Sequence, residues 1–130
     1  MRRRNDASSF MPTSDLQTLA EQLRTFARER EWEPFHSPKN LASALSVEAA
    51  ELLEHFQWMT EAESRALAPQ QREEVALEAA DVLLYLVQLS DKLGIDLFDA
   101  AQRKLAINAK RYPVETARGT SRKARRGDPG

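Results

Sequence analysis

Two stretches of sequence decide the fold of this chain: LASALSVEAAELLEHFQW at residues 41–58 and EEVALEAADVLLYLVQLSD at residues 73–91. Each repeats apolar residues three and four positions apart, the spacing that puts them on one face of a helix. The first face consists of Leu41, Leu45, Leu52 and Phe56, and the second consists of Val75, Ala79, Val82, Leu86 and Leu89. The pattern predicts two amphipathic helices that pack against each other.

Both helices also carry two acidic residues three positions apart, Glu48 and Glu51 in the first, Glu78 and Asp81 in the second. Residues at this spacing share a helix face, so antiparallel packing would bring four carboxylates together. A carboxylate on an apolar face is costly unless it is paired or bound to a metal, and like charges raise one another's pKa. The chain has no cysteine. Oxygen ligands alone favour a hard divalent cation, Mg²⁺, with Mn²⁺ as a substitute.

The alternative interpretation of each acidic pair is a solvated helix surface. The chain is 30% charged, so acidic residues three apart also occur by chance. Two such pairs on the facing sides of two long apolar helices make the metal site the more specific prediction.

The rest of the chain predicts further helices and no strand. We expect four main helices at about residues 15–30, 38–58, 69–92 and 97–111, with a short connecting helix after Thr60 and Glu63. Thr13 or Ser14, Ser37 and Asp96 are the expected N-caps, and Gly94 and Pro113 the expected stops. The prediction is an all-α domain, similar to a four-helix bundle, over residues 14–113.

Residues 1–13 and 114–130 are basic, low in apolar residues and expected to be disordered tails. The part between them is acidic overall, which is a poor surface for a nucleic-acid backbone. No apolar run is long enough to cross a membrane, and the Met-Arg-Arg-Arg start is not followed by an apolar signal segment. We therefore expect a cytoplasmic protein with no membrane attachment and no specific nucleic-acid binding.

The second acidic helix is apolar on more sides than one small core can cover. Leu83, Leu84, Leu86, Val87 and Leu89 follow one another closely. A helix that is apolar nearly all round is buried on most sides. This predicts a homo-oligomer, a dimer or a tetramer, that assembles through this helix.

Several residues near the acidic pairs suit a nucleotide ligand. Trp32, His36 and Trp58 flank the first acidic helix, and flat aromatic faces can stack on a nucleobase. Tyr85 stands one turn after Asp81. In the last helix a cation, an amide and a phenol share one face at four-residue spacing: Lys104, Asn108 and Tyr112. The alternative is that the tryptophans are core or interface anchors and that the polar face is ordinary helix surface.

These residues together resemble the MazG-like superfamily of all-α nucleoside triphosphate pyrophosphohydrolases, in particular its dCTP pyrophosphatase branch. The resemblance rests on Glu48-x-x-Glu51 followed by Glu78-x-x-Asp81, on Trp32-x-x-Phe35-His36-x-Pro38-x-Asn40-Leu41, on Phe56-Gln57-Trp58, and on Lys104-x-x-x-Asn108-x-x-x-Tyr112-Pro113. It covers about residues 16–113.

The resemblance implies hydrolysis of a nucleoside triphosphate, dCTP or a modified dCTP, to the monophosphate and pyrophosphate. It implies that Glu48, Glu51, Glu78 and Asp81 bind Mg²⁺, with Glu51 as our candidate general base. It further implies that Trp32, His36 and Trp58 line the base pocket, that Tyr85 lies by the sugar, and that Lys104, Asn108 and Tyr112 lie by the phosphates and sugar. Sites shared between the subunits of a dimer or a dimer of dimers are also implied.

Three other functions remain open at this point. A pyrophosphohydrolase directed at dUTP or at many nucleotides would use the same helices and differ only in its pocket. A redox bundle would use Glu-x-x-His on facing helices, which this chain lacks there. A helical interaction module without enzymatic activity would use its basic tails to bind a partner.

Overall fold

The computed structural model describes residues 15–123, and this part of the chain is helical with no strand. The helices are α1 (Asp15–Glu29), η2 (Glu33–Phe35), α2 (Pro38–Glu54), α3 (Glu61–Ser64), α4 (Pro69–Lys92), α5 (Leu97–Arg111) and α6 (Val114–Ala117). The all-α prediction is confirmed. The chain divides after Gly94 into two compact units.

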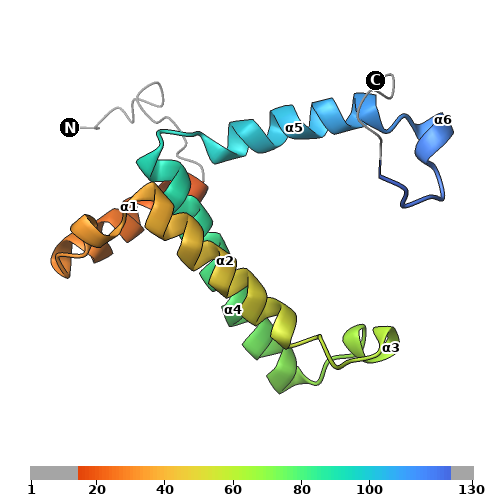
Figure 1. Cartoon of the computed structure of the whole chain (residues 1–130), viewed down its shortest axis with the longest axis horizontal. Helices are drawn as coiled ribbons and strands as arrows, with labels where there is room; N and C mark the ends of the chain where they lie inside the picture. Colours follow the sequence, from red (N-terminus) through yellow and green to blue (C-terminus); the bar gives the residue numbers. More distant parts are fainter. Residues whose placement is uncertain (1–14, 124–130) are drawn as a thin grey trace, which may run out of the picture. The chain divides into compact units, whose positions relative to one another are not determined.

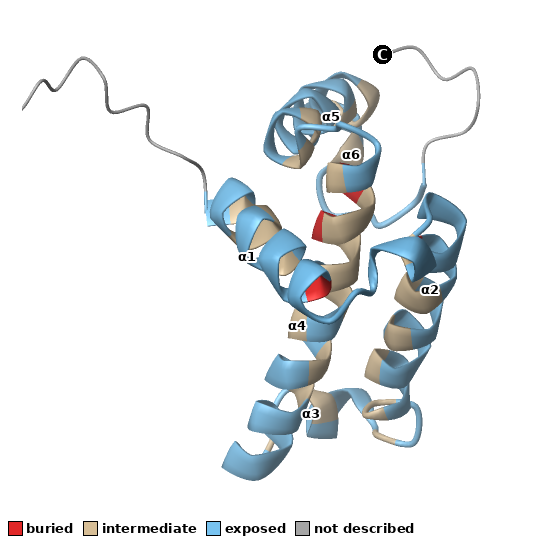
Figure 2. Ribbon diagram, turned by 90° about the vertical axis from the view of Figure 1, so that its left-hand side faces the viewer, coloured by how far each residue is buried: buried red, intermediate tan, exposed pale blue. Residues whose placement is uncertain are grey.

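The first unit is organised around α4. Helix α2 packs along α4 and runs antiparallel to it, with α3 in the connection between them (Figure 1). Helix α1 also packs on α4. Figure 2 shows the three helices with their less exposed residues turned toward one another. The antiparallel packing expected for the two acidic helices is therefore present.

Local sequence signals set the helix ends as expected. The Ser37 hydroxyl accepts a hydrogen bond from the Asn40 amide at 3.1 Å, with Pro38 in the first turn of α2. Thr60 and Glu63 form the predicted capping box of α3. Gly94 ends α4 with a φ of 65°, a conformation that favours glycine. The expected cap at Thr13 or Ser14 lies outside the described residues.

Two boundaries differ from the prediction. Helix α2 ends at Glu54, four residues before Trp58, because the Phe56 amide donates to the Leu53 carbonyl and the Met59 amide to the Phe56 carbonyl, three residues back in each case, which tightens the chain into turns. The segment between the first two expected helices, about residues 31–37, contains the short 3-10 helix η2, which is not among the expected helices.

Few side chains of the described chain are fully buried. Leu41, Ala27, Val87 and Ser90 are buried, Leu41 to 1% exposure. Large apolar residues on α2 and α4 remain exposed: Val47, Leu53, Leu77 and Leu83. None of the described helices is both long and apolar enough to cross a bilayer.

The second unit contains α5 and α6. Asp96 caps α5 by accepting from the Asp99 amide at 3.0 Å, as predicted. The short helix α6 lies beyond the predicted end of the domain at residue 113. The domain limits of 14–113 and the disorder of residues 1–13 and 114–130 remain predictions, and residues 1–14 and 124–130 lie outside the described chain.

Candidate active site

Three of the four predicted carboxylates meet where α2 and α4 pack together. One oxygen each from Glu48, Glu78 and Asp81 lies within 4.8 Å of the other two. Oε2 of Glu48 and Oε1 of Glu78 are buried and have no hydrogen-bond donor in the described part of the chain. Ionised carboxylates only accept hydrogen bonds, so these oxygens cannot satisfy each other. A proton or a cation would satisfy both oxygens.

The fourth carboxylate, Glu51, borders this cluster from a more exposed position on α2. The neighbouring carboxyl of Glu78 raises the pKa of Glu48 above its ordinary value, and partial burial adds to the rise. The Glu48 carboxyl in turn raises the pKa of Glu51. Both shifts express the same fact, that negative charge is crowded here.

A cleft of about 370 Å³ opens beside the cluster, between α1, the turn around η2, and α4. Asp81 belongs both to the cluster and to the cleft wall. Its other lining residues are Leu19, Gln22, Leu23, Phe26, Trp32, His36, Leu84, Tyr85 and Gln88. Known ligand pockets measure about 300–1,000 Å³ and combine apolar walls with a few polar groups. The cleft has both the size and the lining of a ligand pocket.

Aromatic rings make up one wall of the cleft. The Trp32 ring meets Phe26 edge to face at 5.7 Å and His36 at 6.3 Å between centroids. Trp32 keeps 44% of its surface exposed, so part of the indole is available to a ligand. An ion pair between Arg24 and Asp91, with N and O 3.4 Å apart, joins α1 to α4 near the cleft.

The structure brings four predicted ligand residues to this cleft or its edge. Trp32, His36 and Tyr85 line the cleft together with Asp81. Trp58, in the turn after α2, is 89% exposed and is not part of the lining. Lys104 and Asn108 on α5, and Tyr112 at its C-cap, belong to the second unit.

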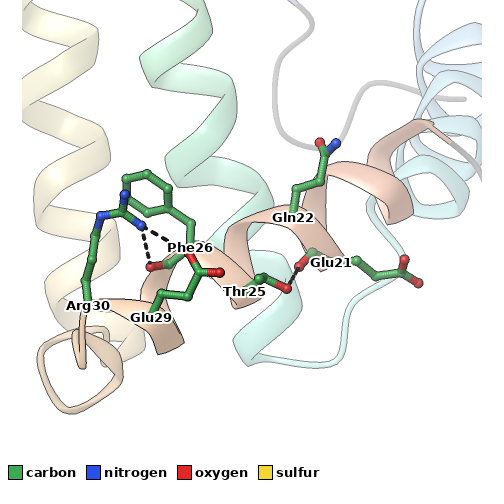
Figure 3. A pocket seen from close by; sticks show the side chains of 6 residues that line it. All are labelled: Glu21, Gln22, Thr25, Phe26, Glu29 and Arg30. Atoms are coloured by element: carbon green, nitrogen blue, oxygen red, sulfur yellow. Dashed lines mark hydrogen bonds and ion pairs between the residues drawn. The ribbon is translucent and has the colours of Figure 1, made fainter.

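A second hollow of about 450 Å³ lies along α1 and the turn after it (Figure 3). Its walls are Glu21, Gln22, Thr25, Phe26, Glu29 and Arg30. The Arg30 guanidinium covers the Phe26 ring at 3.5 Å and donates to the Phe26 carbonyl. Because one helix and its own polar contacts make this hollow, we regard the first cleft as the candidate site.

Six lining residues on α1 and α4 are not among the predicted site residues. Leu19, Leu23 and Phe26 follow the helical spacing of a core face, and Leu84 belongs to the apolar run that predicts assembly. The other two are Gln22 and Gln88. The available signal for Gln88 was its position, seven residues or two turns after Asp81 and thus on the same helix face.

Comparisons with known proteins agree with this geometry. Residues 43–126 match the model of the MazG-like family. The chain is 43% identical over 117 residues to dCTP pyrophosphatase 1 of Homo sapiens, covering 88% of this chain and 69% of that protein. It is 44% identical over 115 residues to dCTP pyrophosphatase 1 of Rattus norvegicus, covering 87% and 68%. A crystal structure of a pyrophosphatase from Archaeoglobus fulgidus superimposes with a TM-score of 0.73 at 39% identity, covering 80% of this chain and 97% of that one.

Proposed function

Because this chain belongs to the MazG-like family, we propose that it hydrolyses dCTP, or a modified dCTP, to the monophosphate and pyrophosphate. One observation carries the proposal: Asp81 is shared between a carboxylate cluster with unsatisfied buried oxygens and an aromatic-lined cleft. The carboxylate cluster suits a metal cation, and the aromatic-lined cleft suits a nucleobase. The names and identities of the relatives support the substrate and its role in clearing the nucleotide pool.

The cluster fits a divalent cation. Three carboxylate oxygens within 4.8 Å of one another, two of them buried without a donor, form an all-oxygen donor set. We propose Mg²⁺, held by Glu48, Glu78 and Asp81 with Glu51 alongside, and Mn²⁺ as its substitute. When bound, such an ion reverses the negative sign of the site toward a triphosphate and lowers the pKa of bound water.

Glu51 is the proposed general base, which takes a proton from the attacking water onto its carboxylate. It is exposed, whereas Glu48 and Glu78 are partly buried. Its exposed carboxylate borders the cluster without being one of the three oxygens that meet there, so it can accept a proton from a water molecule. Attack at the α phosphorus then releases pyrophosphate.

The cleft residues are proposed to hold the nucleoside. The exposed part of the Trp32 ring offers a stacking surface, with His36 beside it. Tyr85 stands one turn after Asp81 on α4, between the cluster and the far end of the cleft, which suits a sugar contact. The proposed base contact of Trp58, and the phosphate and sugar contacts of Lys104, Asn108 and Tyr112, rest on the resemblance and on spacing along the chain.

We further propose a homo-oligomer, a dimer or a tetramer. Exposed apolar side chains on both acidic helices support it: Val47, Leu53, Leu77 and Leu83. The 89% exposed indole of Trp58 also suits a contact with another subunit. A cytoplasmic location is part of the same proposal.

The experiment that tests the function is a substrate panel. The purified chain is incubated with each common dNTP and NTP in Mg²⁺, and monophosphate and pyrophosphate are quantified separately. We expect dCTP to give dCMP and pyrophosphate with the highest kcat/KM, and EDTA to stop the reaction. A preference for dUTP, or similar rates with many bases, would replace the proposed substrate, and no turnover of any triphosphate would refute the function.

A further inference from the structure

Gln88 stands at the far end of the candidate cleft on the helix that also carries the acidic residues. Asp81, Tyr85 and Gln88 occupy positions i, i+4 and i+7 of α4, and all three line the cleft. The helical rise of 1.5 Å per residue puts Gln88 about 10 Å along the axis from Asp81. This is roughly the span of a nucleotide from its α phosphate to the outer edge of its base.

The Gln88 amide has a fixed orientation. Its Nε2 donates to the Leu84 carbonyl at 3.3 Å, and the side chain is partly buried. A carbonyl oxygen only accepts, so the nitrogen of the amide must be the atom that faces Leu84. The amide oxygen and the second N–H of Nε2 are then left to meet a ligand. Turning the amide over would break the bond to Leu84, so the oxygen keeps its position as an acceptor.

Residues of α1, α4 and the turn around η2 surround the Gln88 side chain. A small cavity of about 20 Å³ lies on the other side of Gln88, and its polar lining includes Arg24, His36 and Asp91. Gln88 thus separates the cleft from the ion pair between Arg24 and Asp91. The side chain lines both the cleft and this small cavity and is partly buried, which limits its rotation.

We propose that Gln88 determines base specificity by accepting a hydrogen bond from an exocyclic amino group, as in the N4 amine of cytosine. Uracil presents a carbonyl oxygen at that position, and two acceptors facing each other leave both unsatisfied. A site built to bond a substrate N–H rejects an analogue that lacks it far better than an apolar pocket can. The inference rests on the proposed function and assigns the preference for cytosine to Gln88.

Gln22 is the rival for this role. It also lines the cleft, but it is exposed, and it lines the second hollow along α1 as well. An exposed amide that remains free to rotate serves cytosine and uracil alike. The structure therefore favours Gln88 over Gln22 as the discriminating residue.

The test compares kcat/KM for dCTP, for dUTP, and for the dCTP analogue that lacks the 4-amino group, 2-pyrimidinone deoxyriboside triphosphate. The variant is Gln88→Met, which keeps an unbranched chain of similar volume but has no amide. Gln22→Met tests the rival. Gln102→Met, at an exposed position on α5, is the matched control.

We expect wild type to favour dCTP over both other nucleotides by about 10- to 100-fold, the range for one lost bond and an unsatisfied partner. In Gln88→Met the three kcat/KM values should converge, because deleting the amide and deleting the amine remove the same interaction. Gln22→Met and Gln102→Met should keep the wild-type ratios. A general loss of packing would lower all three values together and leave the ratios unchanged.

An unchanged dCTP to dUTP ratio in a folded Gln88→Met protein refutes the inference alone. So does convergence in Gln22→Met. If the Gln88 variant does not fold, the wild type still decides: equal rates on dCTP and on the analogue without the amine contradict a hydrogen bond to that group. Absence of any dCTP turnover by wild type refutes the proposed function, and this inference with it.

Discussion

Glu48 and Glu51 carry the electrostatic cost of the site in the absence of a cation. Their pKa values are raised by neighbouring carboxyl groups, Glu78 for the first and Glu48 for the second. In the folded state these residues bind protons more tightly than in the unfolded chain. The free energy of unfolding is therefore lower once the pH is high enough to ionise both residues.

This cost predicts a stability that depends on pH and metal together. The free energy of unfolding of metal-free protein should fall as pH rises from about 4.3, the ordinary value for a glutamic acid, through the raised pKa values. Added Mg²⁺ should stabilise the protein more at neutral than at acidic pH, because binding needs ionised ligands. Thermal unfolding in EDTA and in Mg²⁺ across this range measures both effects. Stabilisation by Mg²⁺ that is the same at every pH would contradict the assignment.

Asp81 is the residue that both the cluster and the cleft need. Asp81→Asn keeps the size of the side chain and removes its charge, so turnover should drop by about 100-fold or more while helix content stays the same. Glu73→Gln, an exposed position on the same helix, is the control and should keep wild-type activity. Steady-state kinetics and circular dichroism on both variants provide the readout. Normal turnover by Asp81→Asn would remove this carboxylate from the site.

At the scale of the element, the connection between α2 and α4 sets how the two acidic pairs meet. Thr60 and Glu63 close the capping box of α3, with the Thr60 hydroxyl accepting from the Glu63 amide at 3.1 Å. Thr60→Ala removes that bond. Loss of an N-cap costs about 1 kcal/mol, so the free energy of unfolding should fall by that amount.

Urea unfolding measures the Thr60→Ala effect, with Thr18→Ala as the control. Thr18 is an exposed residue of α1, where alanine favours the helix slightly. An unfolding free energy of Thr60→Ala equal to that of wild type would show that the capping box is not needed to hold the connection.

Most helices of this fold could be predicted from the sequence, because helical spacing and capping residues are local signals. The apolar stripes around Leu41 and Leu86, the Ser37 and Asp96 caps, and the Gly94 stop are local signals, and each element appeared where they indicated. The early end of α2 at Glu54 was not predictable, because it depends on backbone hydrogen bonds to Leu53 that leave no mark in composition.

Part of the candidate site could be predicted in the same way, and part of it could not. Glu48, Glu78 and Asp81 could be predicted because i, i+3 spacing and antiparallel packing together fix their meeting. The cleft beside them could not, since one of its walls comes from α4, which is distant in sequence from α1 and the η2 turn. Leu19 and Phe26 read as ordinary core residues because sequence gives no hint of a space left between packed helices.

At the scale of the whole molecule, exposed apolar surface on α4 predicts assembly. Leu77 is 62% and Leu83 is 39% exposed. Leu83→Asp should reduce the native mass from a dimer or tetramer to a monomer, because an ionised carboxylate is costly in an apolar contact. Analytical ultracentrifugation of this variant against Ala62→Glu, an exposed change on α3, measures it. A wild-type chain that sediments as a monomer at every concentration would refute the proposed oligomer.

The cluster and the cleft together are expected to direct water to the α phosphorus of a cytosine deoxynucleotide. Hydrolysis of dCTP in water labelled with heavy oxygen, with mass spectrometry of both products, tests this expectation. We expect dCMP and pyrophosphate, with the label in the dCMP phosphate. Label in the pyrophosphate, or dCDP and phosphate as products, would contradict it.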